Sequence, residues 1–191
     1  MKKLIPLLLL LFCSLNAYPQ WGVKGGINRS NMTGARIHRC THGAHIGGTY
    51  DLKLSDKWYL QPELLFTSIG CKIGNDGVIV KGGHVYIDAL ELSGNFSLRP
   101  AITNNTKLLL EFGPYARCGL FGSRQYIYHS IPEVSGNPFV DYNRFDTGLN
   151  LGLGIQKNRY FGMLSFQQGF SYVETDISYH QVLRLSLGHR F

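Results

Sequence analysis

The sequence predicts an all-β protein, an eight-stranded antiparallel up-and-down β-barrel that spans a membrane, with short periplasmic turns and longer extracellular loops. Three observations carry this prediction. An export signal precedes eight segments in which apolar and polar residues alternate with a period of two. The connections between these segments alternate between short and long. The sequence finishes on VLRLSLGHRF, an alternating segment whose last residue is Phe191.

The first 17 residues have the pattern of a secretory signal peptide. Two lysines come first, an apolar run covers residues 4–15, and we expect cleavage after Ala17. The apolar run is shorter than the roughly 20 residues that a spanning helix needs. Residues 18–191 are then expected to form a single β-barrel domain, and loss of the two lysines lowers the formal net charge from +7 to +5. The basic residues form no stripe with interleaved aromatics, so we expect no nucleic-acid partner.

Eight segments of the exported chain alternate between apolar and polar residues. RFDTGLNLGLGIQK shows this most clearly, because Phe145 and Leu149 fall on one face of a strand while Asp146 and Asn150 fall on the other. The composition, with 23 glycines, 11 tyrosines and 11 phenylalanines, also favours strands over helices. The strands are expected over residues 21–28, 43–54, 57–69, 84–98, 106–121, 144–157, 159–171 and 181–191.

The connections are short at one end of the predicted strands and long at the other, as in outer-membrane barrels. The short ones cover residues 54–57, 100–106 and 156–159, and the long polar ones cover residues 29–42, 70–83, 122–143 and 172–180. Because lipid offers no hydrogen bonds to the backbone, a sheet in a membrane must close on itself with an apolar outward face. Alternation alone does not exclude the opposite orientation, a secreted lipocalin-like barrel with an apolar interior that binds a small ligand.

Aromatic residues gather at both predicted ends of the strands, as two interfacial girdles would. Near the turn end we place Trp21, Tyr50, Trp58, Tyr59, Phe96, Tyr160, Phe161 and Phe191. Near the loop end we place Phe66, Tyr86, Phe121, Phe145, Phe170 and Tyr172. The segment 84–98 departs from the pattern, because its alternation breaks around Asp88 and Glu91. That break predicts either a β-bulge or a charge that faces lipid, and it leaves the register of the fourth strand open.

Five motifs follow one another along nearly the whole exported chain: WGVKGGINRSNM, SDKWYLQPELLFTSIG, LLLEFGPYARCG, GLNLGLGIQ and LSLGHRF. In this order and spacing they resemble the PorT-like eight-stranded outer-membrane barrels of Bacteroidetes. The fourth strand of that family usually carries an acidic residue followed by Ile-Pro-Leu, whereas this chain has DALEL at residues 88–92. The resemblance implies an integral outer-membrane protein and, for some members of the family, a link to protein secretion.

The resemblance also gives a role to the terminal strand. Outer-membrane barrels typically end on an alternating strand with a terminal aromatic residue, which the barrel-assembly machinery recognises, plausibly by adding that strand to a sheet edge. In this chain the assembly signal would consist of Leu183, Leu185, Leu187 and Phe191. The alternative is that Phe191 serves only as a girdle aromatic.

The inward polar residues predict a lumen that is filled rather than open, because an eight-stranded barrel is just wide enough for side chains. Charges in such a lumen must pair with one another. We expect a lumen polar network of Lys24, Glu63, Glu111, Arg117, Asp146 and Arg184, accompanied by Asp51, Gln61, Asn150 and Arg190. Glu63, Glu111, Arg117 and Arg184 are expected at its centre. A catalytic pair of Glu63 and Glu111 is disfavoured, because such a lumen has no room for a substrate.

The loops offer candidate binding residues. The segment RIHRCTHGAH (36–45) contains three histidines and Cys40, but their spacing matches no common metal site, so we expect no metal. The same basic segment is suited to anionic lipid headgroups or lipopolysaccharide. Loop 122–143 predicts a hairpin that continues the fifth and sixth strands beyond the membrane. Its candidate binding residues are Tyr126, Tyr128, His129 and Phe139. Cys40 and Cys71 both lie near the loop end, so a disulfide between them stays open.

No nucleophile elbow, P-loop, dinucleotide fingerprint or paired CxxC motif occurs in the sequence, and we expect no catalytic residue and no cofactor. The favoured function is a non-enzymatic outer-membrane barrel in contact with lipid, whose loops bind an envelope or extracellular partner or support secretion. A small pore and a lipid-modifying barrel enzyme are the alternatives that keep the protein in the membrane. The enzyme would use a loop-end histidine with a nearby acid. Its candidates are His38, His42, His129 and His180, with Asp141 or Asp176.

Overall fold

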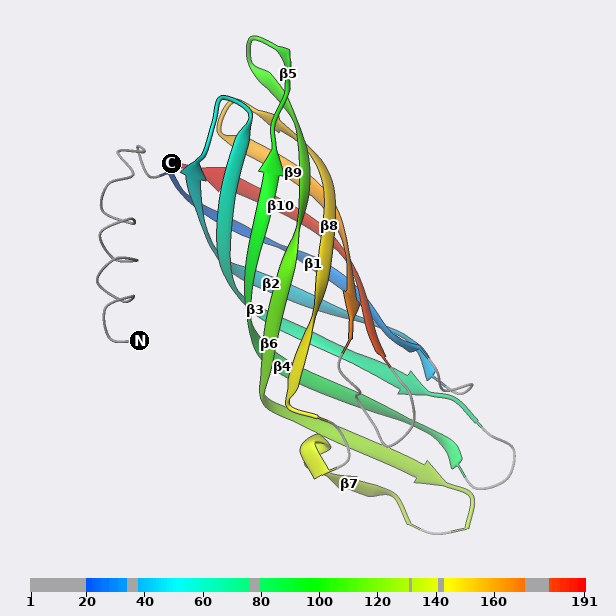
Figure 1. Cartoon of the computed structure of the whole chain (residues 1–191). Coiled ribbons are helices and arrows are strands. Elements are labelled where there is room, and N and C mark those ends of the chain that lie inside the picture. Colours follow the sequence, from blue (N-terminus) through cyan, green and yellow to red (C-terminus); the bar gives the residue numbers. More distant parts are fainter. Residues whose placement is uncertain (1–19, 34–37, 76–79, 131, 141–142, 171–178) are drawn as a thin grey trace, which may run out of the picture.

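The computed structural model describes residues 20–33, 38–75, 80–130, 132–140, 143–170 and 179–191 (Figure 1). The expected signal peptide and the girdle residue Tyr172 lie outside these residues. No helix in the described part of the chain is long and apolar enough to cross a membrane.

Eight long strands form a closed barrel. They are β1 (Gln20–Thr33), β2 (His38–Lys53), β3 (Trp58–Ile73), β4 (Val80–Leu98), β6 (Thr106–Tyr128), β8 (Phe145–Lys157), β9 (Tyr160–Gly169) and β10 (Tyr179–Arg190). Each strand pairs antiparallel with the next one along the chain, and β1 pairs with β10, so the sheet closes. Three short elements accompany the barrel: β5 (Ala101–Thr103), β7 (Val134–Gly136) and the 3₁₀ turn η1 (Pro138–Val140).

The predicted fold class is confirmed, and each of the eight expected segments coincides with one long strand. The strands continue further at the loop end than expected. β1 and β2 include residues 29–33 and 38–42, which the sequence placed in a loop, whereas the continuation of β6 to Tyr128 agrees with the expected extension of the fifth strand. Outside a bilayer a strand needs no apolar face, so hydrophobic alternation does not reveal the extensions of β1 and β2.

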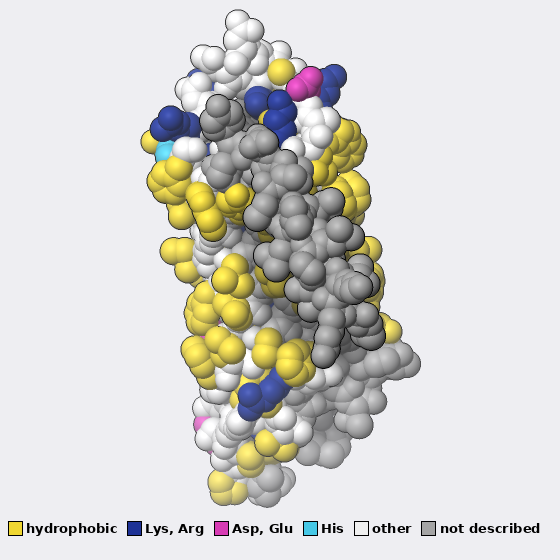
Figure 2. All heavy atoms as spheres, turned by 60° about the vertical axis from the view of Figure 1, so that its left-hand side comes forward, with side chains coloured by type: hydrophobic (Ala, Val, Ile, Leu, Met, Phe, Trp, Pro, Cys, Tyr) yellow, Lys and Arg dark blue, Asp and Glu magenta, His cyan; other side chains and the backbone are white. Residues whose placement is uncertain are grey.

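The barrel is apolar outside and polar inside. Along β8, exposed Leu149, Leu151 and Leu153 alternate with inward Asp146 and Asn150, which are buried. Figure 2 shows hydrophobic side chains over the described middle of one face, with Lys and Arg side chains toward its two ends. Exposure of these apolar side chains to water would be unfavourable by roughly 25 cal/mol per Å². The alternative of a secreted barrel with an apolar interior is therefore wrong, because the lumen is lined mainly by polar and charged side chains.

Aromatic rings cluster at the turn end of the barrel. The Trp21 and Tyr50 ring centroids are 4.7 Å apart. The predicted girdle position of Phe161 is wrong, because its side chain points into the lumen and is buried. The Phe161 ring occupies the space above Gly188, where an added Cβ would lie 2.2 Å from its Cζ atom, and Arg190 stacks 4.4 Å from its centroid. The missing side chain of glycine in β10 makes room for this inward ring.

The alternation of β4 is unbroken, contrary to the expectation from its sequence. Glu91 points into the lumen and is fully buried, whereas Asp88 lies on the outward face. The pairing with β6 shifts between Asp88 and Ala89, where β6 carries Leu120 as an additional residue. The predicted bulge exists, but on the partner strand. Asp88 accepts a hydrogen bond from the Ser68 hydroxyl of β3, which satisfies one oxygen of this outward carboxylate.

Candidate functional site

The lumen is built around one carboxylate, that of Glu91 in β4. Arg184 binds it in a bidentate arrangement, with Nη1 2.6 Å from Oε1 and Nη2 2.8 Å from Oε2. Arg117 donates to Oε2 from Nη2 at 2.7 Å and from Nε at 3.0 Å. The Gln167 amide donates to Oε1 at 2.8 Å. These five hydrogen bonds join β4, β6, β9 and β10 across the interior of the barrel.

A second carboxylate balances the charge of this cluster. Asp146 lies 3.1 Å from Nη1 of Arg117 and accepts a hydrogen bond of 2.9 Å from the Tyr115 hydroxyl. Two arginines thus face two carboxylates, and all four side chains are buried. Buried charges are tolerated when they are paired and hydrogen-bonded in this way. The cluster therefore occupies the middle of the lumen as a rigid, neutral unit.

A second ionic cluster fills the lumen toward the turn end. Arg99 binds Asp51 in a bidentate arrangement at 2.5 and 2.7 Å, and Nε of Arg190 lies 2.8 Å from the same carboxylate. Lys24 forms an ion pair with Glu63 at 2.6 Å. These groups come from β1, β2, β3, the β4–β5 turn and β10. These ion pairs link five parts of the chain across the lumen near its turn end.

The structure places all six residues of the predicted lumen network inside the barrel, but it pairs them differently from the expectation. Lys24 pairs with Glu63, and Arg117 pairs with Asp146. Glu111 accepts a hydrogen bond of 3.3 Å from Ser97 and none from the two expected arginines. Glu91, which the sequence analysis left without a direction, takes the central position. The signal that pointed to Glu91 is the alternation of Glu91, Ser93, Asn95 and Ser97 with Leu90, Leu92 and Phe96.

The loop end of the lumen is apolar. A cluster that we call the apolar plug consists of Met32, Ile69, Cys71, Val85, Ile87, Ala89 and Val182, all of them buried. Phe139 of η1 packs against it, close enough that a Cβ on Gly119 would lie 2.5 Å from the Phe139 ring. Phe139 was predicted among the loop binding residues, but it is half-buried and closes the lumen instead. The interior is thus filled by ionic clusters in the middle and toward the turn end, and by apolar side chains toward the loop end.

At the loop end, β4 and β6 continue the barrel sheet past the end of β8, and β7 adds to β6; we call this extension the loop-end sheet. Tyr128 pairs with Val80 of β4, and Tyr126 pairs with Val134 of β7. Figure 1 shows β6 continuing past the point where β8 leaves it. The expected hairpin of the fifth and sixth strands is therefore wrong in its partners. The segment PFVDY contributes the 3₁₀ turn instead, and Pro138 lacks the N–H group that a ladder requires.

Three of the predicted loop residues lie on or beside the loop-end sheet. The rings of Tyr126 and Tyr128 are 6.2 Å apart, and Arg124 lies 5.8 Å from the Tyr126 centroid. His129 is exposed, with Nε2 3.3 Å from Oδ1 of Asn75. The sheet thus presents aromatic rings and a cation outside the barrel.

In the described part of the cysteine and histidine segment of β2, His45 is taken up by hydrogen bonds inside the barrel. His45 is buried between Asn28 and Ser186, at 2.6 and 2.8 Å. Among the described residues, no three potential ligands converge on one point. Cys40 and Cys71 are register partners in β2 and β3, and no disulfide joins them.

The histidines considered for enzyme chemistry do not converge. His42 is exposed on β2, His129 lies at the tip of the loop-end sheet, and His180 is buried in β10. Asp141, Asp176 and the side chain of His38 lie outside the described residues. Two of the three described candidates are thus exposed on different strands, and the third is buried.

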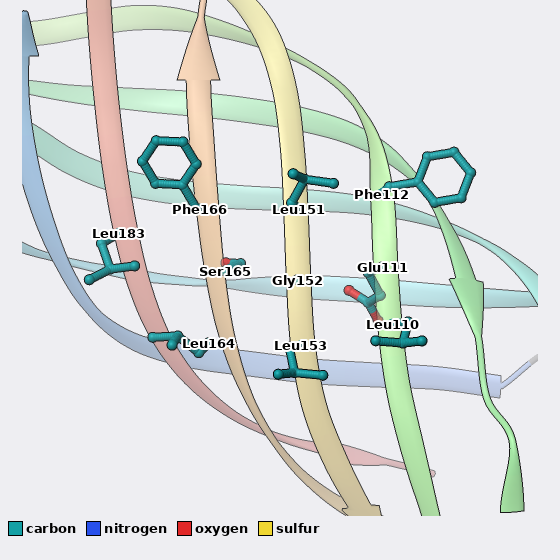
Figure 3. Close-up of a pocket in the computed structure, with 10 residues that line it drawn as sticks. All are labelled: Leu110, Glu111, Phe112, Leu151, Gly152, Leu153, Leu164, Ser165, Phe166 and Leu183. Carbon is teal, nitrogen blue, oxygen red and sulfur yellow. The ribbon is translucent and has the colours of Figure 1, made fainter.

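The outer face carries an apolar groove of about 430 Å³ across β6, β8, β9 and β10 (Figure 3). Leu110, Leu151 and Phe166 are among its walls, and Gly152 contributes no side chain to its floor. The residues of the predicted assembly signal also lie on the outer face. Leu183, Leu185 and Leu187 project outward from β10. The Phe191 N–H donates to the Trp21 carbonyl at 2.8 Å, which continues the β1–β10 pairing by one residue.

Comparison with known proteins agrees with this geometry. A family model described as "Outer membrane protein beta-barrel domain" matches residues 14–174. The chain belongs to this family. The protein is therefore integral to the outer membrane, and the apolar outer face described above is compatible with contact with lipid. No protein with curated annotation has a sequence that matches the chain.

Several solved outer-membrane barrels share the fold of this family member. Ail, the attachment invasion locus protein of Yersinia pestis, is 16% identical with a TM-score of 0.50, over 92% of this chain and all of that one. Neisserial surface protein A is 10% identical with a TM-score of 0.50, over 90% of this chain and 97% of that one. A major outer membrane protein from Thermus thermophilus is 14% identical with a TM-score of 0.50, over 92% of this chain and all of that one. At these identities the likeness concerns the fold alone.

Proposed function

We propose that this protein is a non-enzymatic, non-conducting outer-membrane barrel that presents a recognition surface for an envelope or extracellular partner. The observation that carries the proposal is the loop-end sheet, which extends β4 and β6 beyond the barrel and adds β7 to them. Strand pairing outside the bilayer is not needed for the barrel to span the membrane. A sheet kept in this position is suited to contact with another molecule.

The filled lumen supports the part of the proposal that excludes transport. The cluster around Glu91 and the cluster around Asp51 occupy successive levels of the interior. The apolar plug closes the loop end above them. An eight-stranded barrel has little volume beyond that of its inward side chains. A solute would have to break several buried ion pairs to pass.

The chemistry of the loop-end sheet favours a protein or glycan partner. Tyr126, Tyr128 and Arg124 combine aromatic area with a cation, and residues of these types carry much of the energy of known interfaces. β7 is short and pairs with β6 on one side only among the described residues. A short exposed edge of this kind accepts an additional strand from a partner.

Site-specific photo-crosslinking in living cells tests the proposal. A photoreactive amino acid at Tyr126 or Tyr128 is expected to give a discrete adduct, whereas the same amino acid at lipid-facing Leu153 gives none. The adduct should disappear when the neighbouring tyrosine is changed to alanine, while the heat-dependent gel shift of the barrel is retained. Absence of adducts at both tyrosines, in cells that carry the folded barrel, would contradict a recognition role for the sheet.

We also propose, from the order of the five sequence motifs, that the protein is exported by its signal peptide and belongs to the PorT-like branch found in Bacteroidetes. For some members of that branch, the resemblance also implies a role in supporting protein secretion. Comparison of secreted proteins from cells with and without this chain tests the role. Unchanged secretion would leave the recognition surface as the function and remove the secretion role.

A further inference from the structure

Four basic side chains lie on the outward face of four consecutive strands near the loop end. They are Arg29 of β1, His42 of β2, Lys72 of β3 and His84 of β4, which we call the basic patch. Their neighbours fix this direction, because Ser30, Thr41, Cys71 and Val85, one from each strand, are buried toward the lumen. Arg29, His42 and Lys72 are exposed and His84 is half-buried.

Strand register brings the members of the basic patch together. Arg29 is the register partner of His42, and Lys72 is the partner of His84. Side chains at such positions have Cβ atoms roughly 5 Å apart. Arg39 is the partner of Lys72, and the β2–β3 register shifts by one residue between Cys40 and His45, so the β3 position opposite His42 is two or three residues from Lys72. Two or three residues correspond to roughly 7–10 Å along a strand, so the four side chains share one region of the outer face.

The basic patch lacks carboxylate partners within the described part of the chain. Asp88 is four residues along β4 from His84, about 13 Å, and binds Ser68. Glu133 accepts a hydrogen bond from Gln125, on the side of His84 away from Lys72. Like charges opposite one another weaken a strand pair, so this arrangement is not explained by barrel stability. An anion bound between the strands would replace this repulsion by attraction, because arginine, lysine and histidine side chains can all donate hydrogen bonds to it.

The position of the basic patch in the membrane indicates which anion. Two residues toward the turn end, Ile27 of β1, Ala44 of β2 and Tyr86 of β4 are exposed on the outward face. Two residues correspond to about 7 Å along a strand. The cations therefore lie at the level where acyl chains give way to headgroups. A ligand that fits both levels carries phosphate at the surface and acyl chains below it.

We propose that Arg29, His42, Lys72 and His84 bind the phosphate groups of a phosphorylated glycolipid in the outer leaflet. The patch adjoins the loop-end sheet, because His84 is the register partner of Gln125 of β6, but it includes neither Tyr126 nor Tyr128. Arg29 and Lys72 supply permanent charge, and the two histidines supply further donors. The apolar side chains below the patch contact the acyl chains of the same lipid.

Binding of lipid A by the refolded full-length barrel in zwitterionic detergent tests this site. The probes are bisphosphorylated lipid A, the same lipid with its phosphates removed, and inorganic phosphate. The wild-type barrel should bind bisphosphorylated lipid A at least tenfold more tightly than the dephosphorylated lipid. The double variant R29Q/K72Q should lose that difference. The matched control K57Q/R159Q, which removes two exposed charges at the turn end, should retain it.

Each alternative outcome is informative. Equal affinity of the wild-type barrel for the two lipids would overturn the proposal, and so would an equal loss in the two double variants, which would indicate unspecific attraction. Binding of inorganic phosphate as tightly as the lipid would identify a free anion as the ligand and overturn the lipid assignment. A heat-dependent gel shift in every variant ensures that a lost affinity reports the site rather than misfolding.

Discussion

Glu91 and Arg184 join opposite walls of the barrel, with two hydrogen bonds of 2.6 and 2.8 Å between β4 and β10. Four strand pairings separate β4 from β10 in either direction around the sheet. The ion pair thus acts as a strut across the lumen. Because Arg117 binds the same carboxylate, the loss of the Glu91 charge would leave two buried arginines without this negative counter-charge.

We therefore expect Glu91→Gln to lower the free energy of unfolding by about 3 kcal/mol or more, as measured breaks of buried ion pairs do. Urea unfolding of the refolded barrel in lipid vesicles measures this. The exposed carboxylate of Glu133 provides the control, and Glu133→Gln should change the free energy by less than about 0.5 kcal/mol. Equal effects of the two variants would contradict the role of Glu91 as the central lumen carboxylate.

The wild-type barrel should give no steady current in planar lipid bilayers. Phe139→Ala loosens the apolar plug, but it leaves the ionic clusters around Glu91 and Asp51 in place, so this variant should also stay silent. Stable unitary conductance of the wild-type protein would refute a filled lumen. Conductance of Phe139→Ala alone would place the only barrier at the plug.

The apolar outer face predicts a depth-dependent penalty for charge. Leu153→Arg puts a cation among the leucines of β8 and should cost about 2–4 kcal/mol of unfolding free energy. Thr147 faces outward on the same strand, six residues closer to the loop end, where Thr147→Arg should cost about 0–1 kcal/mol. Unfolding from lipid vesicles measures both. Equal costs at the two positions would mean that Leu153 does not lie within the hydrocarbon.

The terminal aromatic and a neighbouring girdle aromatic can be separated by mutation. The Tyr160 and Phe191 rings both pack against the His189 ring in tilted or edge-on arrangements, with centroids 4.9 and 5.0 Å from its centroid. If Phe191 carries the assembly signal, its deletion should abolish the heat-dependent gel shift of membrane-fraction protein, whereas Tyr160→Ala should leave most of it. A similar loss in both variants would reduce Phe191 to a girdle residue.

The opposed thiols of Cys40 and Cys71 should form a disulfide under mild oxidation. Register partners in an antiparallel pair have Cα atoms about 4.5–5.5 Å apart, within the range that a disulfide spans. Mass spectrometry of digested protein should find the two cysteine peptides linked, with Cys118 still alkylated. Resistance of both thiols to oxidation in the folded barrel would show that their Cβ vectors do not meet.

The residues that face lipid could be predicted from the sequence, because a bilayer requires an apolar outward face on every strand. The alternation of β8 and the inward direction of Lys24, Arg117 and Arg184 follow from that constraint. The contacts between inward charges do not, because they depend on the stagger of strands around the closed sheet. Glu91 illustrates the difference. Its strand is one residue out of step with β6, and no local pattern in β4 reports a bulge on its neighbour.

Other features of the fold could not be predicted from the sequence, for related reasons. The extensions of β1 and β2 lie where no lipid selects an apolar face. Phe161 turns inward because Gly188 on the next strand leaves room for its ring, which is a relation between two strands rather than a property of either. Phe139 reaches the lumen through a 3₁₀ turn that carries no periodic signal.

The hydrogen bond between Phe191 and Trp21 has a consequence for how the protein reaches its final state. It lies at the end of a seam whose two strands are about as far apart in the chain as the barrel allows. Closing so long a loop costs entropy that no local contact offsets in advance. The seam therefore cannot form until the last strand has been delivered, and every earlier intermediate exposes two unpaired strand edges. Completion of this chain is a single late event, in which the first strand must wait for the last.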